Sequence, residues 1–117
     1  MKIRIKNLRL RTIVGIEDWE QNHLQDVIVN IELEFDGRHA AETDAIEQTV
    51  NYKALKKKIL NTAENSRFNL LETMAARLLD LVMEDPKVCA ASVEVDKPHA
   101  LRFADSVSVQ AERSRKT

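Results

Sequence analysis

The residues of this chain with the clearest potential for chemistry lie in one short segment near its C-terminus. Three groups that can bind ligands or move protons, Lys97, His99 and Arg102, fall within six positions. The segment joins two stretches that read as strands, residues 93–96 and 106–109. Hairpin loops usually depend on Gly, Asn or Asp to reach their backbone angles, but this loop contains no glycine. We therefore expect the substrate to bind here.

Lys97 continues the odd-numbered apolar positions Val93 and Val95. Because strand side chains alternate between faces, its ammonium group points to the apolar side if the strand extends that far. A partly desolvated lysine can carry protons near neutral pH. The alternative is a lysine at a strand end whose amino group reaches water.

Glu72 also has two interpretations. It lies three residues after Asn69, which is the spacing of a capping box at the start of a helix. Alternatively, a carboxylate at a helix start accepts the N–H groups of a flat heterocycle. The two interpretations differ in whether the side chain faces a cleft.

Two further candidates lie elsewhere in the chain. Glu20 belongs to a long polar loop. The ordinary interpretation is an acid on the surface, and the functional interpretation is a general base or a substrate contact. Tyr52 stands at the expected start of a helix, where a tyrosine either packs in the core or stacks on a ring.

Composition and motifs exclude several classes of function. The formal net charge of −1 over 117 residues gives no general attraction to nucleic acid or to anionic membranes. The three histidines are not spaced as a short pair of metal ligands, and there is no Gly-rich phosphate loop. We expect no metal and no cofactor. The single cysteine and the alternating N-terminus, which does not resemble a signal peptide, predict a cytoplasmic protein.

The periodicity of the chain predicts the elements that position these residues. Residues 2–13 read as a strand whose apolar parity changes, which indicates a bulge near residues 6–7. Residues 27–35 alternate cleanly as a half-buried strand. Residues 36–48 are polar and are expected to be irregular.

Two helices and two strands complete the expected fold. Asn51 reads as the N-cap of one helix, a second helix is expected from Asn69 to a stop at Glu84-Asp85-Pro86, and strands follow. The order strand, strand, helix, helix, strand, strand predicts one α+β domain, residues 1–117, with a four-stranded antiparallel sheet and two helices on one face. Exposed sheet edges make self-association a reasonable expectation.

The chain resembles the dihydroneopterin aldolase family, and within it most closely the branch of dihydroneopterin triphosphate 2′-epimerases. Nearly the whole chain is covered, through residues 14–21, Gln25, residues 50–52, residues 67–72 and residues 96–100. Aldolases typically read Lys-Pro-Gly-Ala in the last segment, whereas epimerases carry a histidine followed by Ala-Leu-Arg, an aromatic residue and Ala-Asp-Ser-Val-Ser. This chain has the second form, from Lys97-Pro98-His99 to Ser108.

The resemblance implies the tunnelling fold, in which four subunits pair their sheets into a barrel and two rings stack into a homo-octamer, with active sites between subunits. It implies that Glu72 and the backbone around Leu71 bind the pterin, and that Tyr52 stacks on it from a neighbouring subunit. Lys97 is then the proton donor and acceptor, assisted by Glu20. Gln25 is expected to position a water.

The implied activity is epimerisation at C2′ of 7,8-dihydroneopterin triphosphate by retro-aldol and aldol steps. Retaining the cleaved fragment needs additional contacts to its phosphates, for which His99 and Arg102 are candidates by position. The basic first strand is a further possible holder of phosphate. The nearest alternative is aldolase cleavage that releases glycolaldehyde. A non-catalytic binding module is the alternative from another class, and its best support is the basic first strand read as a nucleic-acid surface.

Overall fold

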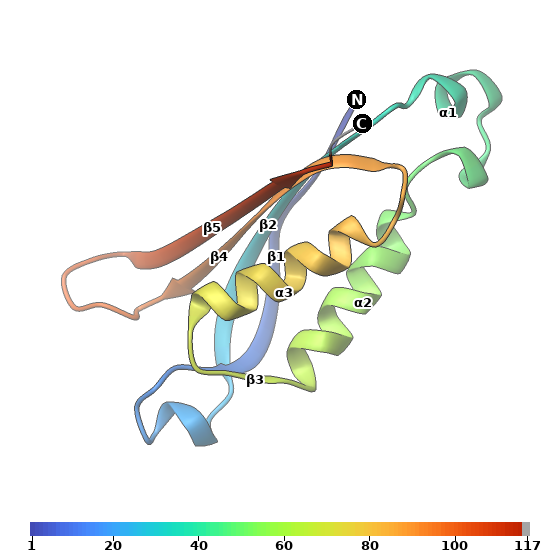
Figure 1. Ribbon diagram of the computed structural model, residues 1–117. Helices are drawn as coiled ribbons and strands as arrows, with labels where there is room; N and C mark the ends of the chain where they lie inside the picture. Colours follow the sequence, from blue (N-terminus) through green and yellow to red (C-terminus); the bar gives the residue numbers. More distant parts are fainter. Residues whose placement is uncertain (116–117) are drawn as a thin grey trace.

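The computed structural model describes residues 1–115 and contains one sheet with helices packed against one of its faces (Figure 1). The elements follow the order β1 (Lys2–Val14), β2 (Gln25–Phe35), α1 (Arg38–Thr43), α2 (Tyr52–Glu64), β3 (Arg67–Phe68), α3 (Leu71–Met83), β4 (Val88–Pro98) and β5 (Ser106–Ser114). In space the strands are arranged β3-β1-β2-β4-β5. The long strands β1, β2, β4 and β5 pair antiparallel, which confirms the predicted α+β architecture.

The central strands show why one face of the sheet is covered. The odd-numbered residues of β2 from Val27 to Phe35 are buried, and the even-numbered residues are only partly covered. Val29 lies opposite Val95 of β4, so the two buried rows are continuous. The apolar stripes of α2 and α3 complete this core, and Figure 1 shows both helices on the same side of the sheet.

The start and end of α2 are both anchored. Asn51 Oδ1 accepts a hydrogen bond from the backbone N–H of Ala54 at 3.1 Å, which confirms the predicted N-cap. At the other end, the buried hydroxyl of Thr12 in β1 donates to the carbonyl of Ala63 at 2.6 Å. Within residues 1–115, no helix is long and apolar enough to cross a membrane.

A bulge in β1 reverses the parity of the strand. The pairing with β2 shifts between Ile5 and Leu8, and Asn7 has a φ of 53°. The side chain of Asn30 in β2 accepts the backbone N–H of Asn7 at 2.8 Å. The predicted bulge is therefore confirmed. Because of it, basic residues at even positions before the bulge and at odd positions after it share the helix-free face of the sheet.

Two elements were not predicted. Arg67 and Phe68 form β3, which pairs parallel with Ile13 and Val14, so the sheet has five strands and is mixed. Residues 38–43, which were expected to be irregular, form α1. Neither element buries enough side chains to produce a periodic pattern, since α1 has no buried residue and β3 has two positions.

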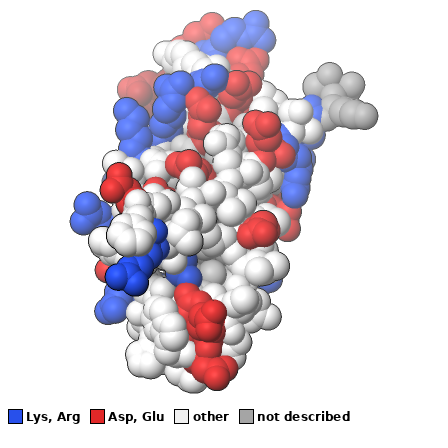
Figure 2. Space-filling view, turned by 90° about the vertical axis from the view of Figure 1, so that its left-hand side faces the viewer, with Lys and Arg blue, Asp and Glu red and all other residues white. Residues whose placement is uncertain are grey.

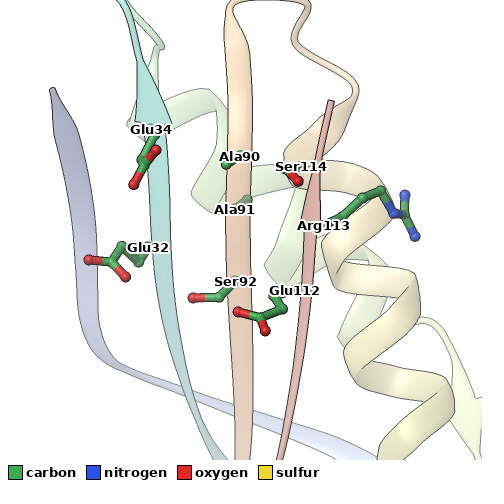
Figure 3. Close-up of a pocket in the computed structure, with 8 residues that line it drawn as sticks. All are labelled: Glu32, Glu34, Ala90, Ala91, Ser92, Glu112, Arg113 and Ser114. Atoms are coloured by element: carbon green, nitrogen blue, oxygen red, sulfur yellow. The ribbon is translucent and has the colours of Figure 1, made fainter. Parts of the chain in front are cut away.

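The helix-free face of the sheet carries ladders of charged side chains. Arg4, Glu32, Ser92 and Glu112 form one row across β1, β2, β4 and β5. Figure 3 shows Glu32, Ser92 and Glu112 beside a shallow hollow of about 300 Å³. The side chain of Arg113 points away from this hollow toward α3. The face thus has basic groups on β1 and acidic groups on the strands beyond it, with Glu32 and Glu34 on β2 and Glu112 on β5.

Candidate active site

A buried ion pair forms the centre of the candidate site. Lys97 Nζ donates a hydrogen bond to Glu20 Oε2, and each residue is only 8% exposed. Strand β4 does extend to Lys97, which lies opposite Val107 of β5. The prediction that its side chain points to the apolar face is therefore confirmed, and the alternative of a lysine that reaches into water is wrong.

The connection between β1 and β2 brings Glu20 to Lys97. A 3₁₀ turn, Glu20–Asn22, folds this connection back on itself. The backbone N–H of Glu17 donates to Glu20 Oε1 at 3.3 Å. Gly15 has a φ of +136°, and a Cβ built there would overlap the Glu20 carboxylate. Glycine is thus required both for the backbone angle and for the space in which the carboxylate lies.

Gln25 and a backbone carbonyl complete the hydrogen bonds around the pair. Gln25 Nε2 donates to the carbonyl of Val14 at 2.7 Å and to Glu20 Oε2 at 3.4 Å. Lys97 Nζ donates to the same Val14 carbonyl at 3.3 Å. The structure therefore brings together three of the predicted residues, Lys97, Glu20 and Gln25, at the end of the sheet.

The surroundings of Glu20 keep it ionised. Burial tends to raise the pKa of its carboxyl, but hydrogen bonds from Lys97, the backbone of Glu17 and Gln25 outweigh burial and lower the pKa below its ordinary value. A carboxylate and an ammonium group therefore face each other in a partly enclosed position. Such a pair can accept a proton from a hydroxyl and return it elsewhere in the same substrate.

Glu72 and Leu71 lie at the start of α3, which β3 holds near the pair. The backbone N–H of Gly15 donates to the carbonyl of Phe68 at 2.9 Å. Pairing in β3 keeps the chain extended as far as Leu70, so α3 begins at Leu71 and has no side-chain cap. The predicted helix start at Asn69 and the capping-box interpretation of Glu72 are both wrong. Glu72 is exposed in the first turn of the helix.

Tyr52 is not brought to Lys97 within one chain. It is the first residue of α2 and is 54% exposed. The last turn of α2, at Ala63, contacts β1 near the site end of the sheet. At 1.5 Å per residue, the 13-residue helix separates its two ends by about 20 Å. A role for Tyr52 at this site therefore requires a second subunit.

The two cationic loop residues have different positions. His99 follows β4 and lines a hollow of about 630 Å³ together with residues of β1 and β2. The guanidinium of Arg102 lies instead 5.3 Å from the centre of the Phe103 ring, and Phe103 is 98% exposed. His99 thus remains next to the site, whereas Arg102 lies outside the residues that line the hollow.

Figure 2 shows the end of the molecule that carries the β4–β5 loop. Uncharged surface covers most of its centre, and acidic side chains gather at its lower end, where Figure 1 places the β1–β2 connection. Among residues 1–115 no group of three or more His, Cys, Asp or Glu side chains is arranged to hold a metal ion.

Sequence reasoning missed several contributors to this region. The Val14 carbonyl and Gly15 were assigned no role, although a glycine before a polar loop is a usable signal for a strained backbone position. Arg9 and Arg11, which line the hollow beside His99, were not singled out, because the basic first strand was considered only as a whole, as a possible holder of phosphate or a nucleic-acid surface. The position of the two arginines depends on the bulge in β1. The sequence indicates that a bulge is present but does not fix the strand register around it.

Solved structures define the class of protein to which this fold and site belong. Over 97% of this chain, the fold superimposes on the crystal structure of Escherichia coli dihydroneopterin aldolase in complex with neopterin, with a TM-score of 0.92, 28% identity and 99% coverage of that chain. The fold is that of the FolB aldolases.

The sequence places the chain within a named family. The dihydroneopterin aldolase family, FolB, matches residues 3–112, and the chain belongs to this family. It is 50% identical to the dihydroneopterin triphosphate 2′-epimerase of Pseudomonas aeruginosa, over 92% of this chain and 88% of that protein. It is 45% identical to the epimerase of Escherichia coli K12, over 92% and 89% respectively. The predicted resemblance is confirmed.

Proposed function

We propose that this protein inverts C2′ of 7,8-dihydroneopterin triphosphate and so produces dihydromonapterin triphosphate. The observation that carries the proposal is the buried Lys97–Glu20 pair, which places a proton donor and a proton acceptor next to each other. The sequence identity of the chain to the named epimerases, 50% and 45%, is higher than its identity to the solved aldolase, 28%. A non-catalytic module has no evident need for this pair, because a buried ion pair is weak support for stability.

The chemistry follows from the conjugated C=N bond of the dihydropterin. Lys97 gives one proton of its ammonium group to the Glu20 carboxylate, and the resulting amine takes the proton of the 2′-hydroxyl. The C2′–O bond becomes a carbonyl as the C1′–C2′ bond breaks. The electron pair of that bond moves to C1′ and is delocalised through C6 to N5. The fragments are the pterin enamine in its anionic form and an aldehyde that carries the triphosphate. When the aldehyde turns over and C1′ attacks its other face, the bond re-forms with C2′ inverted and the proton returns to oxygen.

We assign roles at the site accordingly. Lys97 Nζ moves the proton at the 2′-oxygen, Glu20 accepts a hydrogen bond from its amino group and assists the proton transfer, and Gln25 donates to Glu20. Glu72 and the backbone around Leu71 bind the amino-pyrimidine edge of the pterin. We also propose that the enzyme is a homo-octamer of two stacked rings, in which Tyr52 of a neighbouring subunit stacks on the pterin. The exposure of Tyr52 and its distance from Lys97 within one chain support this arrangement.

The tetrahydro form of monapterin is the expected end of the route that this product enters. The lone cysteine, Cys89, fits a reducing compartment, and the proposal places the enzyme in the cytoplasm. Light scattering tests the assembly directly, since a monomeric protein with full activity would contradict shared active sites.

Product analysis tests the proposed reaction. The purified protein is incubated separately with dihydroneopterin triphosphate and with dihydroneopterin, and the pterins are separated after dephosphorylation and oxidation. We expect monapterin from the triphosphate, approaching a mixture with neopterin. The nearest alternative, aldolase activity, uses the same Lys97 pair. Rapid formation of 6-hydroxymethyl-dihydropterin and glycolaldehyde, without any monapterin, would overturn the proposal in favour of the aldolase.

A further inference from the structure

We propose that Arg9, Arg11 and His99 form the subsite that holds the triphosphate of the substrate, an inference that rests on the function proposed above. The three residues line the hollow of about 630 Å³ at the end of the sheet, which we call the phosphate hollow. Pro98, the residue between His99 and Lys97, lines the same hollow. The hollow therefore reaches the end of β4 that carries Lys97, but it lies on the helix-free face, whereas the Lys97 side chain points to the opposite face. A substrate that contacts both passes around the end of the sheet.

The two arginines project into the hollow from one side of the sheet. Arg9 lies opposite Ile28 and Arg11 opposite Asp26 on β2. Leu10 between them is 5% exposed and belongs to the core. Because strand side chains alternate, both guanidinium groups lie on the helix-free face, two residues apart. The bulge at Asn7 produces this placement.

The charges in the hollow are incompletely balanced. Arg11 contacts Asp26 at 3.3 Å and donates to the carbonyl of Leu24 at 3.4 Å. Arg9 has no ion pair or side-chain hydrogen bond with any residue in the range 1–115. In contrast, Arg4 on the same strand contacts Glu32 at 2.9 Å. Two guanidinium groups with one carboxylate give the hollow a net positive charge, and planar guanidinium groups are well suited to phosphate oxygens.

His99 has an unusual backbone conformation for its residue type. Its φ is 61°, in the left-handed region that disfavours residues with a Cβ. A glycine would adopt this conformation at lower energetic cost. Side chains that remain at such positions are often functional. Here the imidazole borders the hollow, where a ring N–H can donate to a phosphate oxygen.

The position of the hollow suits the step that distinguishes epimerisation from cleavage. After the C1′–C2′ bond breaks, the detached aldehyde carries the triphosphate, so contacts to the phosphates retain the fragment. Lys97 and His99 are two residues apart, which corresponds to at most about 7 Å of extended chain. With the phosphates held in the hollow, rotation about the C2′–C3′ bond presents the other face of the aldehyde. Arg102, expected from sequence to share this role, is not part of the hollow.

Substrate selectivity tests the subsite. We measure kcat/KM for dihydroneopterin triphosphate and for dihydroneopterin, and compare the ratio of the two values in the wild type, Arg9→Ala, His99→Gly and Lys6→Ala. The ratio is expected to fall at least about tenfold in Arg9→Ala, because a charge-assisted contact is lost, and several-fold in His99→Gly. Lys6→Ala removes an equal charge from the same strand outside the hollow and should keep the wild-type ratio.

Calorimetry with inorganic tripolyphosphate provides a readout that is independent of the reaction. Weaker binding in Arg9→Ala and His99→Gly than in Lys6→Ala supports the subsite, even if the wild type forms no monapterin and the proposed function fails. An unchanged ratio together with unchanged tripolyphosphate binding in both variants overturns the subsite, whatever the reaction is. If Arg9→Ala alters the assembly of the protein, the His99→Gly variant alone decides whether the subsite exists, because glycine adopts the φ observed at position 99 without strain.

Discussion

Replacing Lys97 with alanine is expected to lower kcat for epimerisation by about 10²- to 10⁴-fold, the range for loss of a positioned general acid–base group. The amino group donates to Glu20 and to the Val14 carbonyl in the structure, and the site offers no second ammonium group at these atoms. The same substitution leaves the Glu20 carboxylate buried without its partner, so the free energy of unfolding should also fall. Steady-state kinetics with thermal unfolding separates the two effects.

Controls distinguish lost chemistry from lost structure. Lys87→Ala removes an exposed lysine that contacts Asp85 at 3.7 Å and should keep the wild-type kcat. Lys97→Ala protein should still bind pterin, as measured by fluorescence quenching. If active sites are shared between subunits, mixing unfolded Lys97→Ala and Tyr52→Ala chains and refolding them together should restore part of the activity. A folded Lys97→Ala enzyme that binds pterin and keeps full turnover would refute the role of Lys97.

Replacing Glu72 with glutamine is expected to weaken pterin binding by roughly 10- to 100-fold, because hydrogen bonds to a charged group are worth about 1.5–3 kcal/mol. The free energy of unfolding should change by no more than about 0.5 kcal/mol. The reason is that Glu72 is exposed and that α3 begins without a side-chain cap. Binding is measured by titration with neopterin, and stability by urea unfolding.

Glu84→Gln is the matched control for this prediction. Glu84 is the exposed acid at the other end of α3 and contacts Lys58 at 3.7 Å. Its replacement should leave the affinity for neopterin unchanged. If Glu72→Gln instead destabilises the fold by about 1 kcal/mol or more and leaves binding intact, Glu72 acts as a structural residue of the helix start.

The sequence predicts the long elements because each buries one periodic face. The alternation from Val27 to Phe35 identifies β2. The parity of Val93, Val95 and Lys97 predicts a buried lysine only if the strand extends that far, and the structure shows that it does. Short elements leave no such pattern. The two residues of β3 have no measurable period, yet their pairing with β1 delays the start of α3 to Leu71. That delay is why the capping interpretation of Glu72 failed.

The site is only partly accessible from sequence, because it depends on contacts between distant segments. Glu20 and Lys97 are 77 positions apart, and nothing local in either segment predicts their contact. Gly15 is needed because its missing Cβ leaves space for a carboxylate five residues later. Arg9 joins His99 only because a bulge rotates half of β1. In contrast, Tyr52 is far from Lys97 in one chain, so its predicted role depends on assembly.

The proposed inversion at C2′ proceeds by cleavage and re-formation of the C1′–C2′ bond, and the most direct test is the reaction in D₂O. Dihydroneopterin triphosphate is converted by the enzyme in D₂O, and the hydrogen content at C2′ of the monapterin product is read by NMR. In the proposed mechanism the C2′–H bond is never broken, so the inverted product should carry ordinary hydrogen at C2′. Deuterium at C2′ would show that the enzyme inverts this carbon by removing its proton, and it would contradict the mechanism assigned to Lys97.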